Sequence, residues 1–184
     1  LMAACAVRKI EAIRCFSPTK ENRDKFCAEM TPILGIEVQP VDSPEAALRG
    51  ADIAMCASNT VDNIFFDSYV EPGMMISSIK RPEVAASVLK KADRVACHTQ
   101  HGKPLLVASE GLEVPEHAED KGWGSASDVD WKQFPTLPEL IVGRAVGRVK
   151  DSEVTVFLNN LGLGYQFAAA GSVVYRKAKE KGVG

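Results

Sequence analysis

A short polar and basic run follows the first segment of the chain that alternates like a strand. Residues 17–23 read SPTKENR and come directly after the alternating segment 11–16. The hydroxyls of Ser17 and Thr19, with the cations of Lys20 and Arg23 nearby, suit a bound phosphate group, because such groups form charge-assisted hydrogen bonds with phosphate oxygens. A helix that starts at Pro18, with Ser17 as its cap and its charges in solvent, explains the same residues. Both interpretations remain open on these residues alone.

A second candidate is the loop that reads KRPE at residues 80–83, between an apolar segment and a predicted helix. Cations at a helix start oppose the helix dipole, so Lys80 and Arg81 need another reason to be there. An anionic ligand would supply one, although a helix start with solvated charges is the alternative. We take Lys80 and Glu83 as the candidate site residues of this loop.

Three other polar groups carry weaker signals. Ser58 and Asn59 follow an apolar segment and, in isolation, indicate only a turn. His98 and His101 lack a third metal ligand, so we interpret them as part of a surface loop and predict no metal site. The run LGLG at 161–164 lacks the strand, the third glycine and the acidic residue of a nucleotide-binding loop. We interpret it as close packing at a helix start.

The elements that position these residues alternate between strands and helices. Strands are predicted at 11–16, 36–38, 52–57, 74–79, 93–98 and 154–158, with helices at 18–30, 44–50, 82–91 and 161–181. This order predicts a parallel sheet covered on both faces, hence an α/β doubly wound Rossmann-like fold. Ligands of such folds bind outside the carboxyl ends of the strands, where the candidates fall. Since no acid is placed after strand 11–16 to bind a ribose 2′-hydroxyl, we expect NADPH to be preferred over NADH.

Composition narrows the class of protein. The 184 residues are 46% hydrophobic and 25% charged with a net charge of -2, as in soluble globular proteins. The chain lacks the basic face and the high pI that are typical of nucleic-acid-binding proteins. No apolar run approaches the roughly 20 residues that a membrane helix needs. The five cysteines are odd in number and lack a CxxC pair, which favours reduced thiols in the cytoplasm.

Six segments, taken in order, resemble the ornithine cyclodeaminase/mu-crystallin family. They are AIRCFSPTKENRDKFCAEM, ALRGADIAMCASNT, VEPGMMISSIKRPE, KKADRVACH, PELIVGRAVGR and the terminal EVTVFLNNLGLGYQFAAAGSVVYRKAKEKGVG. The resemblance implies a homodimer in which residues 1–150 form the NAD(P)-binding Rossmann-like domain. Residues 151–184 are expected to form a strand and a helix that return to the substrate and dimerisation domain.

The resemblance also implies where the cofactor, NADP or NAD, is bound. Ser17 and Thr19 fall at the adenosine ribose or its phosphate, and Ser58 and Asn59 at the cofactor-contacting end of the next strand. Ile79 and Lys80 fall near the nicotinamide. Asn160 lies near a residue that contacts the nicotinamide from the other side.

By resemblance, the activity expected is that of an NAD(P)-dependent oxidoreductase acting on the C–N bond of an amino or cyclic imino acid. An ornithine cyclodeaminase that uses bound NAD and a crystallin-like, NADP-regulated small-ligand-binding protein are the alternatives. For the oxidoreductase activity, Lys80 is the candidate proton donor or substrate-carboxylate contact. Glu83 is the candidate acid of the same loop, although it does not align cleanly with the acid of the cyclodeaminases. The family's first strand and glycine loop would precede Leu1, so we expect a fragment that binds dinucleotide poorly on its own.

Overall fold

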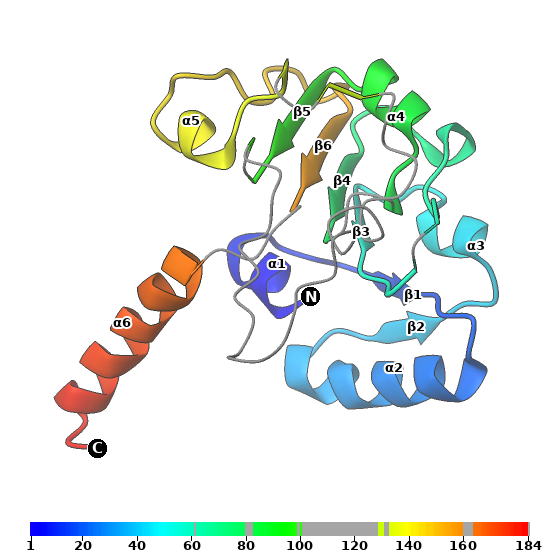
Figure 1. The fold of residues 1–184 in the computed structure, drawn as a ribbon. Helices are drawn as coiled ribbons and strands as arrows, with labels where there is room; N and C mark the ends of the chain where they lie inside the picture. The colour runs from blue at the N-terminus through cyan, green and yellow to red at the C-terminus, as the bar shows by residue number, and fades with distance from the viewer. Residues whose placement is uncertain are drawn as a thin grey trace, which may run out of the picture.

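Every strand pair in the described part of the chain is parallel (Figure 1). The computed structural model describes residues 1–60, 62–79, 83–98, 100, 129–130, 133–159 and 164–183. Within these residues the strands form a four-stranded sheet and a two-stranded sheet. The predicted α/β class with parallel strands is therefore confirmed, although the strand after residue 11 was expected in the same sheet as the others.

The larger sheet has the order β3-β4-β6-β5. Its strands are β3 (Ile53–Cys56), β4 (Met75–Ser78), β6 (Thr155–Leu158) and β5 (Arg94–Cys97). One row of side chains crosses it in register, from Ala54 through Ile76 and Val156 to Val95, and all four residues are buried. Helix α4 (Ala86–Lys91) packs Val88 and Leu89 into the same core. The mostly apolar sequences of these strands follow from this burial.

The smaller sheet pairs β1 (Ile13–Cys15) with β2 (Val38–Pro40). Helix α2 (Lys20–Leu34) closes it, and Ile13, Cys27 and Val38 form its buried core. Strand β2 begins at the last residue of the predicted strand 36–38, because Val38 rather than Ile36 pairs with β1. Phe26, the neighbour of Cys27 in α2, is exposed.

Short helices connect these units. The segments are α1 (Met2–Val7), α3 (Pro44–Leu48), the 3₁₀ turn η1 (Asp67–Tyr69) and α5 (Leu137–Ile141). Helix α3 begins at Pro44 as predicted, and the Ser43 hydroxyl caps it by accepting a hydrogen bond from the Ala46 N–H at 3.1 Å. Helix α2 begins at Lys20 rather than Pro18, with Thr19 as an extended N-cap residue, so Ser17 is not its cap.

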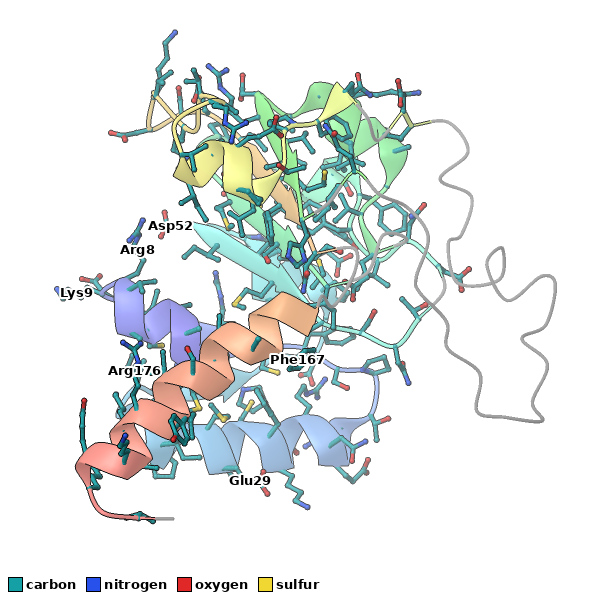
Figure 2. All side chains as sticks on the ribbon, turned by 60° about the vertical axis from the view of Figure 1, so that its left-hand side comes forward. Arg8, Lys9, Glu29, Asp52, Phe167 and Arg176 are labelled. Atoms are coloured by element: carbon teal, nitrogen blue, oxygen red, sulfur yellow. The ribbon has the colours of Figure 1, made fainter. Side chains whose placement is uncertain are left out.

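The last two elements lie apart from each other. Strand β6 was predicted to leave with residues 151–184, but it lies between β4 and β5 because its backbone bonds to both. Helix α6 (Gly164–Glu180) projects away from both sheets (Figure 1), and Figure 2 labels Phe167 near its start and Arg176 farther along it. Its apolar side chains include Phe167, Val174 and Tyr175, each more than 65% exposed. None of the helices in the described ranges is long and apolar enough to cross a bilayer.

Candidate functional site

The candidate site lies where four parallel strands end at one edge of the larger sheet. Ser58 and Asn59 come just after β3, Ile79 follows β4, Asn159 follows β6 and His98 follows β5. Parallel register brings these strand ends together, because Cys56 pairs with Ser78, and Ser78 pairs with Leu158. This is the edge at which ligands of doubly wound sheets bind.

Glu83 links the first two strand ends through its carboxylate. Its Oε1 accepts hydrogen bonds from the backbone N–H of Ser58 at 2.5 Å and from the Ser58 hydroxyl at 2.7 Å. Its Oε2 accepts from the Ser78 hydroxyl and from the backbone N–H of Ile79, both at 3.0 Å. The residue is 0% exposed. A buried carboxylate with this many donors is well compensated for its loss of water.

The hydrogen bonding continues across the remaining two strand ends. The Asn159 N–H donates to the Ser78 carbonyl at 2.8 Å, and the Asn159 side-chain oxygen lies 3.0 Å from His98 Nδ1. His98 also donates its backbone N–H to Leu158 at 2.9 Å, and it is only 3% exposed. The prediction of a surface loop at His98 was wrong, because the residue extends the β5 ladder and its ring packs inside. His101 lies outside the described residues.

A second polar group lies at the carboxyl end of β1. Arg23 is 5% exposed, and its guanidinium lies 5.9 Å from the centre of the Phe16 ring. The same guanidinium donates to the Asp42 carboxylate at 2.6 Å and to the Ser17 carbonyl at 3.4 Å. Lys20 pairs with Asp24 one turn along α2, and this contact raises the pKa of Lys20. Both cations of the predicted phosphate site thus have carboxylate partners.

The cysteine nearest the edge is not set up as a nucleophile. Burial, and secondly the carboxylate of Glu83, raise the pKa of Cys56 to about 12. The reactive form of cysteine is the thiolate, so this thiol is unreactive near neutral pH. Across the described ranges, no three His, Cys, Asp or Glu side chains are grouped to hold a metal ion.

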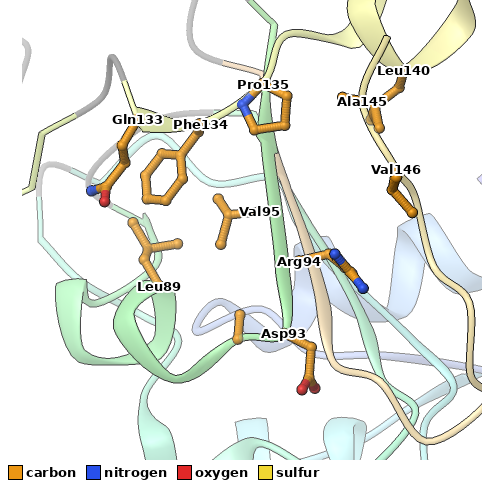
Figure 3. Close-up of a pocket in the computed structure, with 11 residues that line it drawn as sticks. Leu89, Asp93, Arg94, Val95, Gln133, Phe134, Pro135, Leu140, Ala145 and Val146 are labelled. Atoms are coloured by element: carbon orange, nitrogen blue, oxygen red, sulfur yellow. The ribbon is translucent and has the colours of Figure 1, made fainter. Parts of the chain in front are cut away.

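A cavity of about 470 Å³ lies at the other end of β5 (Figure 3). Asp93 and Arg94, at the amino end of that strand, line it together with Phe134 and Leu140. None of the residues that line it belongs to the strand-end group of Ser58, Ile79, Glu83, His98 and Asn159. It is therefore separate from the candidate site.

Comparison with known proteins identifies the family of this chain. Residues 1–182 match the ornithine cyclodeaminase/mu-crystallin family. The chain belongs to this family. The predicted resemblance is thereby confirmed over nearly all of the sequence.

Members of the ornithine cyclodeaminase/mu-crystallin family match the chain end to end. Delta(1)-pyrroline-2-carboxylate reductase of Bacillus cereus is 27% identical, over 99% of this chain and 54% of the relative. The same-named reductase of Thermococcus litoralis, solved in complex with NADH and L-proline, is 27% identical with a TM-score of 0.78, over 100% of this chain and 55% of that one. An archaeal alanine dehydrogenase dimer with bound NAD has a TM-score of 0.75 at 22% identity, over 100% and 54% of the two chains, and supports the fold alone. The chain spans about half the length of the curated relatives it matches.

The structure brings some of the predicted family site residues together. Ser58 and Ile79 meet at Glu83, with Asn59 exposed beside them. Ser17 and Thr19 lie apart from this group, at the end of β1. Lys80 and Asn160 lie outside the described residues.

The sequence interpretation missed four residues of these two groups: Ser78, Asn159, His98 and Asp42. Ser78 and Asn159 carried a usable signal, since a polar residue at the end of an apolar strand lies at the ligand-binding edge. His98 was weighed as a metal ligand and assigned to a surface loop, although the predicted strand 93–98 ends at this residue. Asp42 joins Arg23 through strand pairing, which short-range spacing does not reveal.

Proposed function

We propose that the whole protein is an NAD(P)-dependent oxidoreductase that reduces the C=N bond of a cyclic imino acid, or oxidises the corresponding amino acid. The observation that carries this is similarity along the entire chain, at 27% identity, to proteins named as pyrroline-2-carboxylate reductases. One of them was solved with NADH and L-proline, which unites a nicotinamide cofactor and a cyclic amino acid. The nicotinamide supplies or accepts the hydride, and the protein must orient both reactants and supply the proton.

The residues at the carboxyl edge fit such a cofactor. Ile79 is 48% exposed and offers an apolar surface of the kind a nicotinamide ring packs on. Asn59 is exposed beside it and offers amide hydrogen-bonding groups. We propose that Ser58 and Asn59 contact the cofactor after β3, and that Ile79 and Asn160 flank the nicotinamide.

At the adenosine end, Ser17 and Thr19 are proposed to hold the ribose or its phosphate. Both precede the 15-residue helix α2, whose N-terminus favours negative charge. Lys20 and Arg23 lie in the first turns of that helix and are proposed to contribute positive charge. The cofactor can be NAD or NADP on these groups, since Asp42 and Asp24 offset part of that charge.

Lys80 is proposed as the proton donor or as a contact for the substrate carboxylate. It directly follows Ile79 in the sequence, and the Ile79 N–H is bonded to Glu83. An ammonium there would attract the carboxylate of an imino acid and could protonate a developing amine. Glu83 belongs to the same loop, but its carboxylate is 0% exposed and already accepts hydrogen bonds from Ser58 and Ile79, so Lys80 alone is proposed for the proton.

We also propose that α6 belongs to a substrate and dimerisation domain and that the protein is a homodimer. The exposed apolar side chains of α6 support this, because isolated apolar patches on soluble proteins mark interfaces. The five cysteines are free thiols, which supports a reducing compartment such as the cytoplasm.

A coupled assay tests the proposed activity. The whole protein is incubated with Δ1-pyrroline-2-carboxylate and either NADH or NADPH, and loss of reduced nicotinamide is followed at its absorbance maximum. We expect proline to form in step with cofactor oxidation. Ammonia released from ornithine without net cofactor oxidation would replace the proposal with a cyclodeaminase. Tight binding of an imino acid without turnover would replace it with a binding protein.

A further inference from the structure

We infer that Glu83 is a positioning residue, which fixes the two strand-end turns between which the dinucleotide lies. The expected effect on dinucleotide binding rests on the proposed function. The hydrogen bonds of Glu83 that support the inference do not depend on any substrate. Ser58 comes from the turn after β3, and Ser78 and Ile79 from the end of β4. One carboxylate bonds to both turns.

The donors require a carboxylate at this position. The N–H groups of Ser58 and Ile79 can only donate, and each bonds a different oxygen of Glu83. A carboxylate accepts at both oxygens, whereas a glutamine amide has one oxygen and one NH₂ group. With glutamine, one of the two backbone N–H groups would face another donor. The Ser58 N–H would then lose its bond to Glu83, or the Ile79 N–H would keep only its longer bond to the Cys56 carbonyl at 3.3 Å.

The backbone of Glu83 is also fixed by hydrogen bonds. Its carbonyl accepts hydrogen bonds from the N–H groups of Ile64 at 2.8 Å and Phe65 at 2.9 Å. Phe65 is 1% exposed and belongs to the core of the larger sheet. The side chain is thus fixed at both ends and 0% exposed, which keeps it from reaching a substrate atom. These contacts favour a positioning role over proton transfer.

The consequence concerns the residues next to those that Glu83 binds. Asn59 follows Ser58 and is exposed, while Ile79 turns its N–H inward and leaves its side chain 48% exposed. Fixing Ser58 and the Ile79 N–H sets the spacing and direction of these two exposed groups. A preorganised pair binds a rigid ligand at a lower entropic cost than two mobile turns do.

The chain offers a matched control in Glu153, the other buried glutamate of the described residues. It is 8% exposed, and its Oε2 accepts from the N–H groups of Val149 at 2.8 Å and Lys150 at 3.5 Å. Glu153 precedes β6 and so lies at the opposite edge of the sheet. Its Oε1 also accepts a hydrogen bond from Arg94 at 3.2 Å. Glu153→Gln therefore removes a buried carboxylate, together with one ion pair, far from the strand-end turns.

The experiment compares Glu83→Gln and Glu153→Gln in the whole protein. Amide hydrogen exchange is measured by mass spectrometry on peptides that contain Ser58 or Ile79, followed by NADH and NADPH binding and steady-state kinetics. For Glu83→Gln we expect about ten-fold faster exchange at these peptides and about ten-fold weaker dinucleotide binding. The KM for the dinucleotide should rise more than kcat falls. Glu153→Gln should lower thermal stability without either change.

Three results would overturn the inference. Unchanged exchange at both peptides would show that the carboxylate does not hold the turns. Loss of kcat with normal dinucleotide binding would place Glu83 on the reacting atoms, and equal binding losses in Glu153→Gln would show general destabilisation. If wild type binds no dinucleotide, the proposed function fails and the exchange data alone decide the role of Glu83. Should Glu83→Gln not fold, Ser78→Ala removes one hydroxyl donor, keeps the carboxylate and must show the same changes at smaller size.

Discussion

The guanidinium of Arg23 donates a hydrogen bond to the carboxylate of Asp42 across 2.6 Å. Arg23 lies in the second turn of α2, and Asp42 comes two residues after the end of β2. Parallel pairing of Cys15 with Pro40 brings the ends of β1 and β2 together, and with them these two side chains. A carboxylate therefore lies at the predicted phosphate site, although none follows β1 directly. The predicted preference for NADPH rested on the absence of a carboxylate at this place, and Asp42 weakens that argument.

Removing this carboxylate should shift cofactor preference toward NADPH. Asp42→Asn leaves the Arg23 guanidinium without its acidic partner, so more of its charge is available to a 2′-phosphate. The Asp42 side chain is 94% exposed, and solvent screening limits the effect. We expect the ratio of NADPH to NADH affinity to rise about three- to ten-fold, as measured by titration calorimetry on the whole protein.

The control for this substitution is Glu29→Gln. Glu29 pairs with Lys25 on the same helix, so the variant makes the same change in net charge one to two turns farther from the α2 N-terminus. Its affinity ratio should stay near that of wild type. A rise of equal size in both variants would mean that net charge, and not the Arg23–Asp42 pair, sets the preference.

Gly73 should tolerate no side chain. Its φ is +82°, and a Cβ atom would lie 2.6 Å from the Asp151 carbonyl oxygen. For Gly73→Ala we expect a loss of about 2–4 kcal/mol in the free energy of unfolding, from the left-handed backbone and the overlap together. Gly50 has φ +63°, and a Cβ atom there would meet no other atom within 4 Å, so Gly50→Ala carries only the backbone cost. Urea unfolding of both variants checks this, and equal losses would contradict it.

The strands of the larger sheet could be predicted because each is a short apolar run between turn signals. Ile76, at the centre of β4, is 0% exposed, as a strand covered on both faces requires. The cap at Ser43 is equally local, since its hydroxyl bonds three residues along the chain. At Ser17 the same Ser-Pro signal failed, because the carbonyl of that residue bonds Arg23 and the helix begins later.

The site was less predictable because its bonds join distant parts of the chain. Ser58 and Glu83 are 25 positions apart, and His98 and Asn159 are 61 apart. Which strand ends meet depends on the sheet order β3-β4-β6-β5, in which the last strand inserts between two earlier ones. Spacing along the sequence carries no direct signal of that insertion. Resemblance to a family placed Ser58 and Ile79 at the cofactor, but it gave no indication that Glu83 binds both.

Loss of the Asn159 side chain should destabilise the strand-end group. Its oxygen lies 3.0 Å from His98 Nδ1, and His98 is buried, so Asn159→Ala leaves that ring nitrogen without this partner. We expect a loss of about 1–3 kcal/mol in the free energy of unfolding. Asn22→Ala on the exposed face of α2 should change it by less than about 0.5 kcal/mol. Identical melting temperatures for the two variants would show that the contact with His98 does not contribute to stability.

The Cys56 thiol should resist alkylation in the folded protein. Burial and the Glu83 carboxylate raise its pKa from 9.0 to about 12, so at pH 8.5 the folded chain holds about a thousand-fold less Cys56 thiolate than the unfolded chain. We expect iodoacetamide to modify the Cys56 peptide correspondingly more slowly than in concentrated urea, as followed by mass spectrometry.

The same shift gives a pH dependence with a definite sign. Because the folded-state pKa of Cys56 is the higher one, the thiol stabilises the fold fully below pH 9, and this contribution is lost as pH rises toward about 12. Cys56→Ala lacks the titrating group, so its free energy of unfolding should fall less steeply above pH 9 than that of wild type. Parallel pH profiles for the two proteins, together with rapid alkylation of folded Cys56, would show that the thiol is not buried beside Glu83.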